Sequence, residues 1–280
     1  MASAPKANLP LLYKDLMPLN TRDHAKWQTR SVDRAPWIAN EHAIPITSDE
    51  FAQAQRHFPI VFSNGENPVP LALMGLHEGV NTFFDETGKA VEEDFYVPAY
   101  IRRYPYLLVR LNKDNEDMSL CFDPTPDLLG EFKDGRPLFE DDGQPTEMTK
   151  EILQFCENFE AAGMRTASMV DELKKHDLLM DGEIAIQRGD NDNTPFVYRG
   201  FKMVNQEKLR ELRGDQLRTW NQNGLLPLIF AHLFSLDRMR FIFARQAQQN
   251  KGPMAAAASA APAGEVTDTK ASKKVEPAKS

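Results

Sequence analysis

Prolines and glycines interrupt the first half of this chain so often that they leave little room for long helices. Eight of them fall between residues 45 and 88, and breakers at this density limit a helix to two or three turns. The apolar runs between them are short and rich in Val, Ile and Phe, as strands are, and cover residues 59–62, 69–76 and 82–84. The last run ends at the turn sequence Asp85-Glu86-Thr87-Gly88, which predicts a hairpin.

Two further patterns complete this half of the chain. Thr47 and Glu50 form a capping-box sequence, which predicts a short helix over residues 48–55. The apolar segments 106–111 and 118–122 flank polar residues and predict a second pair of strands joined by a turn.

Helical periodicity begins after residue 145. Thr146 is a suitable N-cap, and the apolar residues that follow it at helical spacing are Met148, Ile152, Phe155 and Phe159. A second apolar stripe at residues 169–173 follows Gly163 and is expected to end near residue 181. Later segments predict strands at 184–187 and 196–204 and helices at 207–212, 216–221 and 228–248.

Strands and helices therefore segregate along the chain more than they alternate. We predict an α+β fold, with a mixed or antiparallel sheet of short strands in the first half and helices mainly after residue 145. From Asn250 onward the chain has almost no large apolar side chain and cannot offset the entropy cost of ordering. We therefore predict a flexible N-terminus over residues 1–9, a single domain over residues 10–249 and a disordered tail over residues 250–280.

The charge distribution narrows the range of partners. The formal net charge is −8, and the last thirty residues carry five Lys against three acids, so the body before them is at −10. An acidic surface repels phosphate at long range, and we expect no nucleic-acid binding.

Sequence signals for export and membrane insertion are weak. Cys121 and Cys156 are far apart without a CxxC spacing, so we expect two buried, reduced thiols. Residues 1–8 lack the apolar region of a signal peptide, and the most apolar stretch, 225–234, is too short to span a bilayer. These features predict a cytoplasmic protein with no membrane span.

The segment 96–106 is the most informative cluster of functional side chains. Tyr100 and Tyr104 are four residues apart, so a single helical turn would place both rings on one face. Arg102 and Arg103 cannot both lie on that face. We expect one to project toward solvent or a carboxylate while the other packs its aliphatic stem.

Two interpretations of this cluster stay open. In one, an arginine clamps a carboxylate or phosphate and tyrosine hydroxyls orient it. In the other, the tyrosines seal the edge of the core and the arginines pair with surplus acids. The candidate ligand-binding residues are Arg102, Arg103, Tyr96, Tyr100, Tyr104, Arg56 and His57.

Motifs for metal or nucleophilic chemistry are absent from the sequence. The six histidines show no HxH or HExxH spacing, and neither a GxSxG nor a GxxxxGK motif occurs. The loop residues Asp190, Asp192 and Asn193 resemble part of a calcium loop but lack its bidentate Glu, so we interpret them as an ordinary acidic loop. We predict no metal, no cofactor and no catalytic residue.

Several longer runs resemble the SapC family of bacterial proteins. They are RHFPIVF at 56–62, LALMGL at 71–76 and above all YVPAYIRRYPY at 96–106, with weaker similarity at 13–20, 138–146 and 232–236. The resemblance spans about residues 10–245. It implies a link to bacterial surface-layer proteins and to the export of surface components, and it brings no catalytic mechanism.

These observations favour a non-catalytic binding or accessory protein with a protein or peptide partner and a small anionic ligand. The alternative is an enzyme whose anion-binding site combines the segment 96–106 with Arg56 and His57.

Overall fold

The computed structural model describes residues 9–111, 118–187 and 195–251. Its largest sheet has five strands in the order β10-β11-β4-β5-β3, with every neighbouring pair antiparallel. Three strands come from the first half, β3 (Ala43–Pro45), β4 (Ile60–Phe62) and β5 (Pro70–Leu73), and two from the second, β10 (Leu179–Ile186) and β11 (Phe196–Val204). The α+β class is confirmed, but the main sheet joins both halves of the chain.

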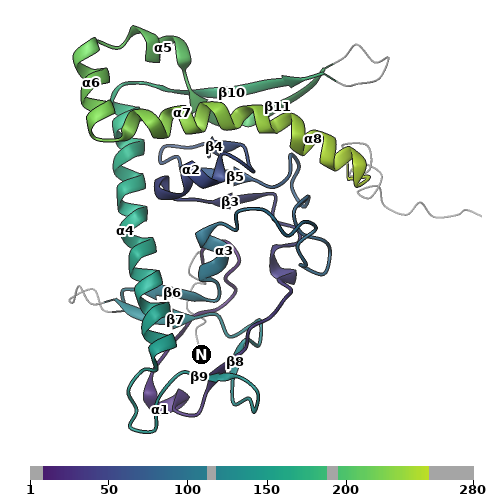
Figure 1. The fold of residues 1–280 in the computed structure, drawn as a ribbon, viewed down its shortest axis with the longest axis vertical. Helices are drawn as coiled ribbons and strands as arrows, with labels where there is room; N and C mark the ends of the chain where they lie inside the picture. The colour runs from purple at the N-terminus through teal and green to yellow at the C-terminus, as the bar shows by residue number, and fades with distance from the viewer. Residues whose placement is uncertain (1–8, 112–117, 188–194, 252–280) are drawn as a thin grey trace, which may run out of the picture.

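Two small sheets lie at the other end of the molecule (Figure 1). One has the order β1-β7-β6 and consists of Met17–Pro18, Ser119–Phe122 and Tyr106–Val109. The other has the order β8-β2-β9 and consists of Leu129–Gly130, Gln28–Thr29 and Arg136–Pro137. The predicted strand pair around residues 106–122 is thus confirmed.

The predicted strand at 82–84 is wrong in extent, because only an isolated bridge between Phe84 and Ala90 forms there. The side chain of Asn81 provides the reason: its Oδ1 accepts from the backbone N–H groups of Phe83 and Phe84 at 2.9 and 3.1 Å. Backbone donors that bond a neighbouring side chain are lost to a strand ladder. The turn after it begins with the carboxylate of Asp85, which accepts from the N–H of Thr87.

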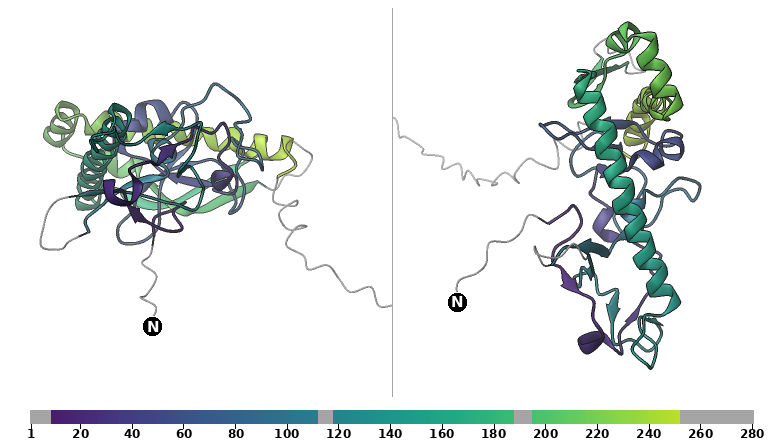
Figure 2. Two further views of the ribbon diagram at one scale, coloured as in Figure 1. Left: turned by 90° about the horizontal axis from the view of Figure 1, so that it is seen from below. Right: turned by 90° about the vertical axis from the view of Figure 1, so that its left-hand side faces the viewer.

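One helix, α4 (Glu147–Lys175), runs the length of the molecule and connects the two ends (Figures 1 and 2). Thr146 caps it as predicted, since its side chain accepts from the N–H of Thr149. The sequence predicted two apolar stripes on either side of Gly163, and the helix continues through this glycine without a break. The buried positions continue at helical spacing through Ala162, Thr166, Met169 and Leu173, and burying that face outweighs the roughly 1 kcal/mol that a helical glycine costs.

A second helical run, α7 (Leu225–Ser235) followed by a 3-10 turn (Leu236–Arg238) and α8 (Met239–Gln248), lies along the β10-β11 hairpin (Figure 1). It begins three residues before the predicted start at 228, because Pro227 falls in the first turn, where no N–H donor is needed. The shorter helical elements are α1 (Thr21–His24), η1 (Pro36–Ile38), η2 (Ser48–Glu50), α2 (Phe51–Ala54), α3 (Ala99–Arg103), α5 (Gln206–Glu211) and α6 (Gly214–Gln222). The Thr47/Glu50 capping box is present as predicted.

Two clusters of buried side chains form the core. The larger one packs under the five-stranded sheet, with Trp220, Phe58 and Phe62 among its fully buried members. The smaller one gathers around Phe122 and Leu138 at the end with the small sheets. Cys121 and Cys156 are buried free thiols, as expected.

No helix among the described residues has the length and apolar character needed to cross a bilayer. The polar turn 112–117, the acidic loop at 190–193 and nearly all of the predicted tail lie outside the described residues.

Candidate anion-binding site

The segment that carries Arg102 and Arg103 folds as the short helix α3, held between two prolines. Pro98 precedes the first helical residue, and the N–H of Ala99 donates to Oε1 of Glu50 at 2.7 Å. Tyr104 ends the helix in an extended conformation (ψ 134°), as is usual for a residue that precedes proline. Both arginines therefore lie in the last turn, on different faces.

The side chain of Arg103 is buried in the protein interior. Only 4% of it is exposed, and its Nη1 lies 2.8 Å from Oε1 of Glu160 on α4. Its guanidinium carbon lies 4.1 Å from the ring centroid of Phe159 and 5.1 Å from that of Tyr100. This side chain joins α3 to α4.

Arg102 is exposed, so the expected divergence of the two arginines is confirmed. Its Nη2 donates to the hydroxyl of Tyr96 at 3.3 Å, and its guanidinium carbon lies 5.3 Å from the ring centroid of Phe155. It forms no ion pair with any residue that the structure describes. Its positive charge is therefore not balanced by a neighbouring carboxylate of the described chain.

The three candidate tyrosines all donate to protein acceptors. Tyr96 donates to Oε1 of Glu50 at 3.0 Å, and Tyr100 donates to the carbonyl of Leu11 at 2.6 Å. Tyr104 donates to Oδ2 of Asp123 at 3.2 Å. Burial raises the pKa of both Tyr96 and Tyr100 to about 12, so these hydroxyls stay protonated and hold the segment in place.

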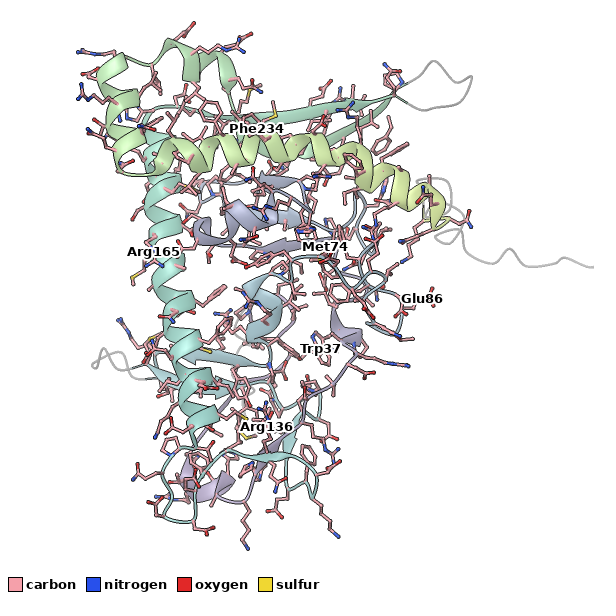
Figure 3. All side chains as sticks on the ribbon, viewed as in Figure 1. Trp37, Met74, Glu86, Arg136, Arg165 and Phe234 are labelled. Carbon is pink, nitrogen blue, oxygen red and sulfur yellow. The ribbon has the colours of Figure 1, made fainter. Side chains whose placement is uncertain are left out.

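Arg102 opens onto a cavity of about 400 Å³ that contains three more arginines, Arg30, Arg34 and Arg136. We call it the arginine cleft, defined by these four residues. They come from three separate segments: the chain after β2, α3, and β9. Asp33 is the one carboxylate among its described lining residues. Figure 3 labels Arg136 and Trp37, which line the cleft below the five-stranded sheet.

The arginines of the cleft differ in how they are held. Arg30 stacks over the ring of Phe132 at 3.5 Å and its Nη2 lies 3.1 Å from Asp134, an exposed carboxylate that occupies only part of the guanidinium. Arg136 faces Thr29 in the β2-β9 pairing. Neither Arg34 nor Arg136 forms an ion pair within residues 9–111, 118–187 and 195–251.

Two polar atoms of cleft-wall residues are buried away from solvent and have no hydrogen-bond partner among the described residues. They are the hydroxyl of Tyr106, a residue only 7% exposed, and Nε1 of Trp37. Thr29 lies beside the Tyr106 hydroxyl without forming a well-directed bond, and burial raises the pKa of Tyr106, so the group stays a donor. An unpaired buried polar group costs about 1–3 kcal/mol.

Arg56 and His57 lie elsewhere, directly after α2. Burial, then the positive charge of Arg238, lowers the pKa of His57. Neither residue lines either of the two cavities that Arg102 lines. The structure thus does not bring them together with α3.

Sequence reasoning missed Arg30, Arg34, Arg136 and Trp37. Their convergence depends on the pairing of β2 with β9, which joins segments far apart in the chain, and no local pattern signals it. Among the described residues, no group of three His, Cys, Asp or Glu side chains is placed to hold a metal ion.

The comparisons with known proteins agree with the sequence resemblance. The family model described as SapC matches residues 19–241, which includes α3, the arginine cleft and α7. No curated protein and no solved structure matches this chain. Because the match covers most of the chain, this protein belongs to the SapC family.

Proposed function

We propose that this protein is a non-catalytic binding or accessory protein that holds a small anionic ligand in the arginine cleft. The observation that supports this most is that four arginines and only one carboxylate, Asp33, are among the described lining residues of one cleft, in a body whose net charge is −10. Arginine binds carboxylates and phosphates bidentately, so such a cleft is suited to an anion.

The wall of the cleft favours binding over catalysis. Guanidinium groups and aromatic rings make up most of its functional side chains, and neither histidine nor cysteine is among its described lining residues. An enzyme that combines α3 with Arg56 and His57 has less support, because those residues line neither cavity beside Arg102.

A protein or peptide partner is the second part of the proposal. Three large side chains on the outer side of α7 and α8 are exposed: Phe230 by 40%, Phe234 by 69% and Phe241 by 55%. Exposed aromatic side chains gathered on neighbouring helices are typical of an interaction surface. The biological setting that we propose is the biogenesis or export of bacterial surface components, which rests on the family resemblance.

Calorimetric titration with phenyl phosphate tests the anion site. We expect wild type to bind, and Arg102→Gln to weaken binding about tenfold, the scale of one lost charged hydrogen bond. The matched control is Arg165→Gln, because Arg165 is an exposed arginine on α4 that pairs with Asp49 outside the cleft (Figure 3). Equal affinity of all three proteins would refute the site.

A further inference from the structure

A second cavity adjoins the arginine cleft. Its volume is about 280 Å³, and its wall includes Arg102, Arg136 and Tyr106, which also line the cleft. The two cavities thus share Arg102 and Arg136, two of the three cleft arginines that form no ion pair within the described residues. A guanidinium pair at such a junction can hold one anionic group by several parallel hydrogen bonds.

The two cavities differ in their chemistry. On the cleft side, Arg30 and Arg34 add positive charge. On the other side, the wall contains Phe155 and Met148, its one carboxylate is Glu151, and its additional arginine, Arg103, is already paired with Glu160. The second cavity therefore offers more apolar surface and less unpaired positive charge than the cleft, and it suits an uncharged or apolar group better than a second anion.

An anion bound at the junction has space on both sides. A carboxylate or a phosphate monoester ends its branch of a molecule, so it would leave one of the cavities filled only by water. A phosphodiester continues on both sides of its single charge. This difference favours a phosphodiester over a carboxylate or a phosphate monoester as the ligand.

We propose that the ligand of the arginine cleft is a phosphodiester, held at its internal charge by Arg102 and Arg136 with an uncharged substituent in the second cavity. This inference rests on the proposed function, because it names the class of anion for the same site. The Phe155 ring, close to the Arg102 guanidinium, forms the contact surface for that substituent.

Two probes that differ in one substituent test the proposal: diphenyl phosphate and phenyl phosphate. We expect wild type to bind diphenyl phosphate at least about tenfold more tightly, although it carries less charge. Glu151→Trp places an indole in the second cavity, and we expect it to weaken diphenyl phosphate binding about tenfold while phenyl phosphate affinity changes less than about twofold. Glu157→Trp is the matched control, since Glu157 is an exposed residue of the same helix outside the cavity wall.

Each outcome decides a separate point. If wild type binds phenyl phosphate and gains nothing from the second ring, or if Glu151→Trp weakens both probes equally, the phosphodiester inference is wrong and the anion site stands. If wild type binds neither probe, the anion site and the proposed function are both wrong. Retained binding of phenyl phosphate by Glu151→Trp also shows that this variant is folded.

Discussion

His232 is a fully buried histidine at the joint between the two halves of the main sheet. Its Nδ1 donates to the carbonyl of Ile60 on β4 at 2.8 Å, and its Nε2 accepts from the N–H of Val204 on β11 at 3.0 Å. This pattern requires the neutral ring, because a protonated Nε2 would face a donor. Burial lowers the pKa of His232 from 6.5 to about 4.

The first prediction concerns stability toward acid. The folded pKa of His232 is depressed, so its contribution is complete above pH 6.5 and is lost as the pH falls toward 4, since the unfolded chain binds the proton first. We expect the free energy of unfolding of wild type to fall by up to ~1.4 kcal/mol per pH unit more than that of His232→Gln. Urea titrations from about pH 7.5 to about pH 4.5 measure both slopes. Parallel pH profiles would contradict the assignment.

At the scale of single residues, the sequence predicted that Arg102 and Arg103 would point in different directions, but not which of the two would be buried. That choice depends on Glu160 of α4, whose carboxylate lies beside Arg103. The element that packs against each face of α3 is determined by the tertiary structure, so the spacing within residues 96–106 cannot predict it.

Among the elements, α4 shows how burial overrides a local breaker. Gly163 lies inside this helix of 29 residues and faces open space, with no atom within 4 Å of an added Cβ. The sequence supplied the cap and both apolar stripes of α4. It did not predict that the two stripes belong to one continuous helix, because the low helix propensity of this glycine opposes the tertiary packing that favours the helix.

The second prediction follows from that geometry. Gly163→Ala should raise the free energy of unfolding by about 0.5–1 kcal/mol, because alanine has less backbone entropy to lose in a helix. Gly182→Ala on β10 is the contrast. The added Cβ would lie 2.2 Å from the ring of Phe201, so this substitution should lower the free energy of unfolding by more than ~1 kcal/mol. Denaturant unfolding of both variants checks the opposite signs, and a loss of stability for Gly163→Ala would show that an added methyl group at residue 163 is not accommodated.

For the molecule as a whole, the predicted segregation of strands and helices gave the α+β class. It did not give the three sheets, because strand partners such as β2 and β9 are set by long-range pairing. The arginine cleft exists only through that pairing. The outward position of the exposed phenylalanines of α7 and α8 likewise depends on which helix faces the hairpin covers.

The third prediction separates the two parts of the proposed function. The double variant Phe230→Ser with Phe234→Ser should lose a surface or export protein that co-purifies with wild type from the native organism, as identified by mass spectrometry. Both side chains are substantially exposed, so folding should be little affected. The double variant should keep the phenyl phosphate affinity of wild type, and Arg102→Gln should keep the protein partner. A change in both properties for either variant would contradict two independent sites.

The length of α4 has a consequence for occupancy. Twenty-nine residues at 1.5 Å each make a rod of about 43 Å, with the arginine cleft beside one end and the helices α7 and α8 at the other. A ligand and a partner protein bound at these two proposed sites would not overlap. If both proposed sites are used, one molecule of this protein would hold a small charged ligand and a macromolecule together in a ternary complex.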